Sequence, residues 1–426
     1  MIELPYGHTT VPFDEAGATV LCSRLGALAG GRAGAELVRE AMKQPIGSKR
    51  LHQLAKGKRT CTVVVSDHTR PVPSRDILPP MLSELRQGNP EIEITLLVAT
   101  GFHRSTTKQE LIAKLGEDIV SNERIVVHDC MDAASNVPIG VLPSGAPLVI
   151  DRLAAETDLL VSEGFIEPHF FAGFSGGRKS VLPGVCDRVT VLGNHCSRFI
   201  DSPFARTGIL EGNPIHADMV AAARLAKLAF CVNVIIDENK KTVAAFAGDP
   251  IRAHAAGCAF LRPYCEVSAA QSDIVITTNG GAPLDQNVYQ CVKGLTAAEA
   301  AARDGGVLIM LSECADGTGG DGFYHSLADC ESPAALYDAI MATPQDRTIP
   351  DQWESQILAR ILRRNRVIFV TRPEMAQIVC KMKMDYAPSL ENALAKARKI
   401  KGGSASVSVI PNGISIMITP AAHINS

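Results

Sequence analysis

Side chains that can move protons or bind anions follow three apolar segments, at the place where each segment ends. In chain order they are Asp67, His68, Thr69 and Arg70 after VVVS, Thr100, Gly101 and His103 after LLVA, and His169 and Lys179 beyond LLVS. Histidine accepts and returns protons near neutral pH, and arginine binds a carboxylate through two parallel hydrogen bonds. Ligands of parallel sheets bind beyond the carboxyl ends of the strands. We therefore expect these residues to form one site.

The segment GFSGGRKS is close to a phosphate-binding loop, which reads G-x-x-x-x-G-K-[ST]. Gly173, Lys179 and Ser180 match, but Arg178 replaces the second glycine and adds a Cβ where the backbone must approach a phosphate. Pro183 also interrupts the helix that should follow. A phosphotransferase of this type is a disfavoured alternative, and Lys179 needs another role.

A zinc hydrolase built on His103, His169 and His195 is a second alternative, although no H-E-x-x-H helix supports it. The twelve cysteines supply no metal cluster either, because no C-x-x-C pair occurs. We interpret them as small buried apolar residues in a reducing compartment.

Composition places the chain among globular enzymes. Its 426 residues suggest two domains, and 46% hydrophobic with 20% charged residues is typical of a soluble protein. A formal charge of −3 gives no electrostatic reason to bind nucleic acid or an anionic membrane surface. The first residues lack the features of a signal peptide, and no apolar run approaches the ~18 residues that span a bilayer. We expect a cytoplasmic protein.

Short, continuously apolar segments predict buried parallel strands. In the first part of the chain they are 61–67, 94–101, 124–129, 158–164 and 231–237. Helical stretches at 74–88 and 107–120 separate some of them, which implies right-handed crossovers in an α/β fold. A second series at 273–281, 305–314 and 366–371 is long enough for another α/β domain.

The expected architecture is therefore two α/β domains with mainly parallel sheets and the active site in the cleft between them. The larger domain comprises 6–270 plus 370–420, and 271–369, possibly with 1–5, forms the smaller one. Residues 406–418 read as a hairpin or strand pair that turns at Asn412 and Gly413, and they could return to the first domain.

Several longer motifs resemble the lactate racemase family that uses a nickel pincer nucleotide. They are SDHTRPVP (66–73), TGFHR (100–104), EGFIEPHFFAGFSGGRKSVLPGV (163–185), GNH (193–195), YQCVKG (289–294) and DQWE (351–354). Their order and approximate spacing match the family over most of the chain, and the element at 163–185 is highly specific.

The resemblance implies a cofactor and its attachment points. In this family the lysine of GGRKS, here Lys179, forms a thioamide with a pyridinium-3-thioamide-5-thiocarboxylic acid mononucleotide that carries nickel. The histidine of GNH, His195, would be the protein's ligand to nickel, for which imidazole is suitable. Enzymes that make and deliver this cofactor are implied partners. Thr69, Thr100 and Gly101 are expected to contact its phosphate and ribose.

The reaction that the resemblance implies is inversion of the carbinol carbon of a 2-hydroxy acid. Abstracting that proton would create a carbanion beside a carboxylate, whereas removing hydride leaves a flat 2-oxo acid that accepts hydride on either face. The cofactor carries the hydride, and protein groups orient the substrate and move the hydroxyl proton. His103 and His169 match the family's two acid–base residues.

The remaining motif residues are assigned to substrate and cofactor. Arg70 is expected to bind the substrate carboxylate, with Gln290 and Lys293 contributing from the second domain. Tyr289 and Trp353 are expected to form an apolar wall. Asp67 could orient Arg70 or bind polar groups of the cofactor, and a non-catalytic protein that stores the cofactor remains a third alternative.

Overall fold

The computed structural model describes residues 1–28, 31–237 and 239–421. It divides into two compact units, each built from separated parts of the chain. The N-terminal unit comprises 24–195 and 202–264, and the C-terminal unit comprises 1–23, 196–201 and 265–426.

A six-stranded sheet forms the centre of the N-terminal unit, in the order β13-β12-β9-β4-β5-β6. The strands are β4 (Thr60–Ser66), β5 (Glu93–Ala99), β6 (Arg124–Val127), β9 (Leu159–Phe165), β12 (Leu228–Ile236) and β13 (Thr242–Gly248). All pairings are parallel except that of β13 with β12. The five predicted strands of the first series are therefore confirmed, and β4, β5 and β9 are adjacent.

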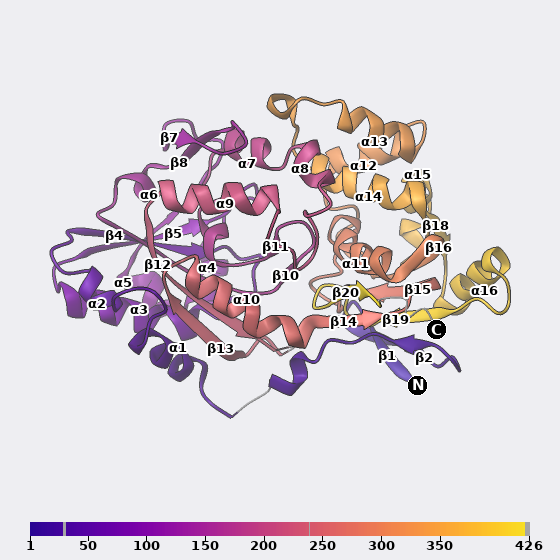
Figure 1. Ribbon diagram of the computed structural model, residues 1–426, viewed down its shortest axis with the longest axis horizontal. Coiled ribbons are helices and arrows are strands. Elements are labelled where there is room, and N and C mark those ends of the chain that lie inside the picture. The colour runs from indigo at the N-terminus through magenta and orange to yellow at the C-terminus, as the bar shows by residue number, and fades with distance from the viewer. Residues whose placement is uncertain (29–30, 238, 422–426) are drawn as a thin grey trace. The chain divides into compact units, whose positions relative to one another are not determined.

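Helices cover both faces of this sheet (Figure 1). One face packs in a single core against α1 (Gly34–Lys43), α2 (Leu51–Leu54), α3 (Ser74–Gly88) and α4 (Lys108–Leu115). On the other face lie α6 (Arg152–Glu156) and α9 (Pro214–Leu225). The helix predicted over 107–120 is divided into α4 and α5 (Glu117–Asn122) by Gly116, whose φ of +95° an α-helix does not allow.

Smaller elements of this unit surround the ends of the strands. β7 (Asn136–Val141) pairs with β8 (Pro147–Asp151), and β10 (Pro168–His169) pairs with β11 (Gly173–Phe174). The 3-10 helix η2 (Gly177–Ser180) follows β11, and α7 (Arg188–Asn194) comes next. Helix α10 (Arg252–Cys265) completes the unit.

The C-terminal unit contains a second six-stranded sheet, which is entirely parallel and has the order β18-β17-β16-β15-β19-β3. Its strands are β3 (Thr19–Val20), β15 (Ser272–Thr278), β16 (Ala302–Leu311), β17 (Arg366–Val370), β18 (Asp385–Ala387) and β19 (Val407–Ile410). A further parallel pair joins β14 (Glu266–Ala269) to β20 (Met417–Pro420).

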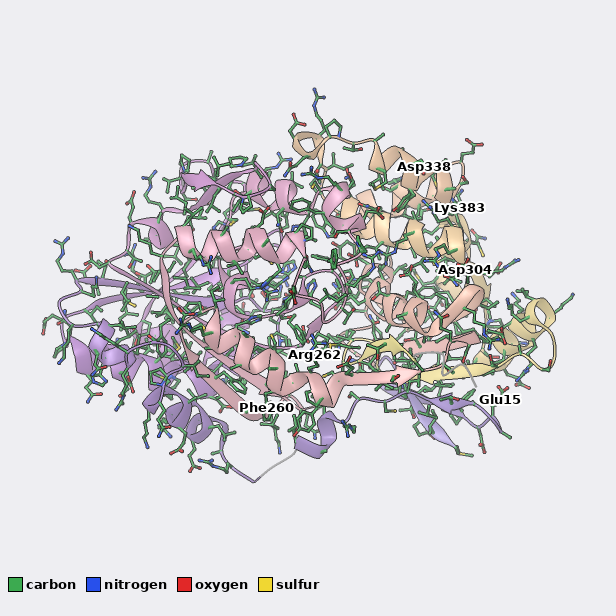
Figure 2. All side chains as sticks on the ribbon, viewed as in Figure 1. Glu15, Phe260, Arg262, Asp304, Asp338 and Lys383 are labelled. Carbon is green, nitrogen blue, oxygen red and sulfur yellow. The ribbon has the colours of Figure 1, made fainter. Side chains whose placement is uncertain are left out.

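One face of the second sheet packs on α16 (Leu390–Lys401) and on the hairpin of β1 (Ile2–Tyr6) and β2 (Thr9–Phe13). Helices α11 (Val288–Ala301) and α14 (Gln352–Arg364) also contact this sheet. The other helices are α8 (Ser197–Asp201), α12 (Asp321–Ala328), α13 (Pro333–Met341) and α15 (Ala376–Lys381). Ion pairs of arginines with Glu15, Asp304 and Asp338, labelled in Figure 2, link parts of this unit.

The sequence-based division of the chain needs correction at both ends. Residues 370–420 do not join 6–270, because β18 pairs with β17 and β19 pairs with β15. The N-terminal segment also belongs with 271–369, and it extends to residue 23 because β3 pairs with β19. Local hydrophobicity identified strands, but it does not specify which sheet a distant strand joins.

The predicted hairpin at 406–418 is wrong in its pairing. Two strands, β19 and β20, do occur there, but each is parallel to an earlier strand and they belong to different sheets. The predicted burial of the cysteines is confirmed for nine of the twelve, and the reducing compartment stays a prediction. None of the helices in the described part of the chain has the length and apolarity needed to cross a membrane.

Candidate active site

His103 and Asp67 form a hydrogen-bonded pair beyond the ends of β5 and β4. Nδ1 of His103 lies 2.7 Å from Oδ2 of Asp67, and the hydroxyl of Thr69 donates to Oδ1 of the same carboxylate at 2.8 Å. Burial opposes ionisation of Asp67, but the hydrogen bond and charge of His103, with Arg70 and Thr69, outweigh it and lower its pKa. An ionised Asp67 accepts from Nδ1–H, so Nε2 of His103 is the nitrogen that takes up a proton.

Arg70 lies three residues after Asp67 and is half-buried. Its guanidinium forms no hydrogen bond or ion pair with any described residue, and its nearest compensation is the charge of Asp67. A half-buried guanidinium with its donors unused is suited to a bidentate carboxylate. The hydrogen bond of Asp67 to His103 is neither of the two roles expected for it, which were to orient Arg70 or to bind the cofactor.

Thr100 and Gly101 connect the His103 loop to its surroundings. The buried Thr100 hydroxyl donates to the carbonyl of His128 at 2.7 Å, and the Gly101 amide donates to the carbonyl of Gly184 at 3.0 Å. His128 is itself held between Asp151 and a backbone carbonyl, as expected of a structural histidine. Their predicted contacts with a cofactor stay predictions.

His169 and Lys179 face each other across the turn that joins β10 to η2. The Lys179 amine lies 3.2 Å from Nε2 of His169, and the amide of Ala172 donates to Nδ1 of that ring at 3.3 Å. The Lys179 nitrogen and Nε2 of His169 are therefore within hydrogen-bonding distance of each other. A lysine amine is the kind of group that attacks an acyl group once it has lost its proton.

The ring of Phe171 contacts His169, Lys179 and also His195, a third polar residue near this turn. The Phe171 ring lies 4.6 Å from that of His169, 5.7 Å from the Lys179 amine and 5.2 Å from the ring of His195. His195 follows α7 and is buried; burial and then the charge of Lys179 lower its pKa to about 3. Nδ1 of His195 donates to the carbonyl of Val191 at 3.1 Å, which makes Nε2 the nitrogen that carries the lone pair of the neutral ring.

Arg178, the residue that broke the phosphate-loop motif, shapes the turn before Lys179. Its guanidinium is fully buried, and burial lowers its pKa to about 10, so it stays charged at neutral pH. It donates to the carbonyls of Ala172, Phe174 and Gly176 and to Nδ1 of His216, and Nε2 of His254 lies within hydrogen-bonding distance of both the guanidinium and the carbonyl of Ser175. These carbonyls lie in the turn between His169 and Lys179, which the arginine therefore fixes.

The two disfavoured alternatives do not fit this geometry. A phosphate-binding loop requires a helix after its glycines, whereas η2 spans only Gly177–Ser180 and Arg178 points into the protein. Among residues 1–28, 31–237 and 239–421, no three His, Cys, Asp or Glu side chains gather to hold a metal. A zinc site on His103, His169 and His195 is thereby contradicted. A metal whose other donors come from a cofactor needs only His195.

The predicted substrate residues of the C-terminal unit lie on α11 and α14. The Lys293 amine donates to Oε1 of Gln290 at 2.5 Å, one turn earlier on α11. Asn279, at the end of β15, donates to the carbonyl of Gln290 and accepts from the amide of Gly294. A Cβ at Gly294 would lie 2.4 Å from the Asn279 oxygen, which explains the glycine of YQCVKG.

Trp353 and Tyr289 are hydrogen-bonded neighbours rather than a purely apolar wall. Tyr289 bonds to Trp353 and Asp351, and its burial, with the charges of Glu354 and Asp351, raises its pKa. Glu354 is buried beside Lys293. Burial is the main reason that its pKa rises to about 8; the positive charge of Lys293 acts to lower this pKa, and the negative charge of Asp351 acts to raise it. Its Oε1 has no hydrogen bond to a described residue.

Sequence reasoning missed several residues that support these clusters. Phe171 and Glu354 stood inside quoted motifs but were assigned no role, and Arg178 was noted only as the residue that breaks the phosphate-loop pattern. Asn279, in ITTNGG, follows a predicted strand as Asp67 does, and that position was a usable signal. Their roles depend on burial and partners that the sequence does not specify.

Comparison with known proteins identifies the relatives of the chain. Residues 7–208 match the family described as lactate racemase N-terminal domain, and residues 267–418 match lactate racemase C-terminal domain. The chain is 51% identical over 420 residues to a lactate racemase of Thermoanaerobacterium thermosaccharolyticum and 50% identical to one of Lactiplantibacillus plantarum. Each comparison covers 98% of this chain and 99% of the relative.

Solved structures agree with the sequence relatives. The lactate racemase apoprotein of Thermoanaerobacterium thermosaccharolyticum superposes with a TM-score of 0.95 at 50% identity, covering 98% of this chain and 99% of the other. A Thermotoga maritima protein shares 18% identity with a TM-score of 0.65, covering 91% and 97%, and shows a common fold alone.

Proposed function

The chain belongs to the lactate racemase family, and from that premise we propose that it interconverts the two enantiomers of lactate. It is an isomerase of the racemase class. The proposal extends to the chemistry: hydride leaves the carbinol carbon, a 2-oxo acid forms, and hydride returns to either face.

The residues that would hold a nickel pincer nucleotide are Lys179 and His195. The fit rests on two observations: the Lys179 amine lies 3.2 Å from Nε2 of His169, and His195 is a buried imidazole whose pKa burial lowers to about 3 and whose Nδ1 donates to the carbonyl of Val191. When bound, this cofactor would supply the acceptor and donor of hydride. Everything else is done by side chains of the protein.

Proton transfer to and from the substrate hydroxyl is assigned to His103 and His169. His103 would accept the proton at Nε2, and the buried carboxylate of Asp67 stabilises the charge that the ring then carries. His169 has a different support, since an amide donates to its Nδ1 and its ring stacks on Phe170 at 5.0 Å. A base for each enantiomer is needed because their hydroxyls point in different directions.

Substrate orientation is assigned to Arg70, whose unused guanidinium donors suit a carboxylate. Gln290 and Lys293 are predicted to bind the same substrate, and Tyr289 and Trp353 to border its methyl group. Holding the carboxylate leaves only the substituents of the carbinol carbon free to reorganise.

The observation that carries the proposal is the hydrogen-bonded pair of Lys179 and His169 at 3.2 Å. The test is co-expression with cofactor-making enzymes, followed by intact-protein mass spectrometry, nickel analysis and chiral chromatography of lactate. We expect an adduct on Lys179, copurifying nickel, and racemisation from either enantiomer. Lys179→Ala should lose all three.

Activity without an adduct on Lys179, or in protein without nickel, would contradict the mechanism. An adduct without turnover on any single-enantiomer 2-hydroxy acid would instead favour a protein that stores the cofactor. The cofactor-making enzymes as partners and a cytoplasmic location stay predictions.

A further inference from the structure

The loop between β4 and α3, residues 66–74, carries Asp67 and Arg70 but has few hydrogen bonds of its own. Pro71 and Pro73 have no amide hydrogen to donate. Within the loop, the backbone bonds are those of the Arg70 amide to the Asp67 carbonyl at 3.3 Å and of the Ser74 amide to the Val72 carbonyl at 2.9 Å. A loop of this kind needs external anchors to hold a guanidinium in one place.

Glu163 anchors both ends of the loop. It lies on β9, beside β4, and is 4% exposed. Its Oε1 accepts from the Ser74 hydroxyl at 2.7 Å, from the Ser66 amide at 3.3 Å and from the Ser66 hydroxyl at 3.4 Å. Ser66 is the last residue of β4 and Ser74 the first of α3, so one carboxylate oxygen holds the entry and the exit of the loop.

Lys114 anchors the middle of the loop. From the last turn of α4, its amine donates to the carbonyl of Arg70 at 2.9 Å. Burial lowers the pKa of Lys114, and the negative charges of Glu163 and Asp67 oppose this while Arg70 adds to it. Burial likewise raises the pKa of Glu163, whereas the charge of Lys114 and the hydrogen bonds from Ser74 and Ser66 act to lower it.

We propose that Lys114 and Glu163 are positioning residues that hold the 66–74 loop so that Arg70 presents its guanidinium to the substrate carboxylate. Buried charged side chains are costly to a fold, and apolar replacements of similar size commonly serve stability as well or better. Here Glu163 bonds to Ser66 and Ser74, on either side of Arg70, and the Lys114 amine bonds to the carbonyl of Arg70 itself. This inference rests on the proposed function, because it assigns the loop to that substrate.

The first experiment replaces Lys114 in the cofactor-loaded enzyme. Lys114→Met keeps most of the apolar stem but loses the donor, whereas Lys114→Arg can still donate to the Arg70 carbonyl. We expect Lys114→Met to raise KM for each enantiomer of lactate about tenfold, the usual weight of one charge-assisted hydrogen bond. Its kcat should change less than about threefold, because Arg70 holds ground state and transition state alike. Lys114→Arg should restore most of the KM.

Lys108→Met is the matched control, since Lys108 is exposed on the first turn of the same helix and should leave KM unchanged. A second readout needs no cofactor: amide hydrogen exchange of the apoprotein. Peptides covering 66–74 should exchange faster in Lys114→Met, and those covering β12 should not.

Glu163→Gln keeps an oxygen that accepts from Ser74 and removes the charge, so we expect the fold to survive this substitution, whereas Glu163→Ala would leave a buried cavity. We expect KM to rise about threefold. Since both residues act through one loop, the double variant Lys114→Met with Glu163→Gln should be little worse than Lys114→Met alone.

The outcomes separate this inference from the proposed function. Unchanged KM and unchanged exchange at 66–74 in Lys114→Met would overturn the positioning role. Faster exchange throughout the N-terminal unit, with kcat falling as much as KM rises, would overturn it too, by revealing a general structural role. If the loaded wild-type enzyme racemises nothing, the proposed function fails, and the exchange experiment still decides whether Lys114 holds the loop.

Discussion

The N-terminal and C-terminal units each place a lysine beside a fully buried glutamate, but the two pairs are built differently. Glu163 accepts three hydrogen bonds through one oxygen, and its partner Lys114 donates to a backbone carbonyl. Each glutamate leaves one oxygen without a partner among the described residues, Oε2 of Glu163 and Oε1 of Glu354, but Lys293 donates to the side chain of Gln290 rather than to a backbone carbonyl.

The difference shows how the same residue types serve two purposes. In the first pair, Oε1 of Glu163 bonds to Ser66 and Ser74 and the Lys114 amine bonds to the Arg70 carbonyl, so the two side chains position a loop. In the second pair the lysine is itself a predicted substrate ligand, and the neighbouring carboxyl sets how much of its positive charge is compensated. Glu354 is uncharged below its pKa of about 8, so at neutral pH Lys293 keeps its charge for an anion.

The largest effect should come from the carboxylate that supports His103. Asp67→Asn keeps the size of the side chain but cannot stabilise a protonated His103, so kcat should fall about a hundredfold or more. Both directions of racemisation should lose the same factor in kcat/KM, because the two enantiomers have equal free energies. Stopped assays with each enantiomer and chiral chromatography provide the measurement; a kcat within threefold of wild type would exclude Asp67 from this role.

The next largest effects should come from replacing Arg70 of the N-terminal unit and Lys293 of the C-terminal unit. Arg70→Met should raise KM for lactate about 30-fold and Lys293→Met about tenfold, because a bidentate guanidinium makes two charge-assisted bonds and an amine fewer. Steady-state kinetics of the loaded variants measure both, with the exposed Lys381→Met as control. Equal KM values in wild type and Lys293→Met would remove Lys293 from the substrate site.

Glu354 predicts a pH dependence confined to the C-terminal unit. Above a pH of about 8 the ionised carboxyl compensates Lys293, so KM should rise several-fold, and Glu354→Gln should abolish the rise. The charged or titratable groups around it are Lys293 and Tyr289 on α11 and Asp351 before α14. A KM that rises equally in the variant would assign the dependence to another group.

The free energy of unfolding should also depend on the ionisation of Glu354, and the direction of this dependence can be worked out. The folded-state pKa of Glu354 is raised, so between its ordinary value of 4.5 and about 8 the folded protein holds a proton that the unfolded chain lacks. The free energy of unfolding therefore falls as pH rises through this window, and Glu354→Gln, which cannot ionise, should gain a few kcal/mol over wild type across it. Urea denaturation at pH 5 and pH 8 measures the difference.

The smallest effects test the anchoring of Glu163. Ser74→Ala removes a 2.7 Å bond to a buried carboxylate and should cost about 1–2 kcal/mol of unfolding free energy. Ser66→Ala removes only a 3.4 Å contact and leaves the amide bond, so it should cost less than about 0.5 kcal/mol. Chemical denaturation ranks the two; the opposite order would mean that the loop is held mainly at its entry.

Much of the architecture followed from local patterns. Continuous apolar runs identified most strands of both sheets but not β3, β13 and β18. The polar residues after β4, β5 and β9 do lie at the ends of adjacent strands. The pattern failed where the answer depended on distant partners. Residues 370–420 and the first 23 residues joined the second sheet, because strand pairing is decided by which exposed edge each strand completes.

The sequence by itself determined the candidate chemistry: the motif residues His103, His169, Lys179 and His195, and the family to which they belong. Only the tertiary structure decided what each of them touches. Asp67 supports His103, Arg178 fixes the turn before Lys179, and the buried Glu163 and Glu354 differ in their bonds although they are the same residue type. The physical reason is that charge, tautomer and pKa depend on burial and on hydrogen-bond partners, which come from segments far apart in the chain.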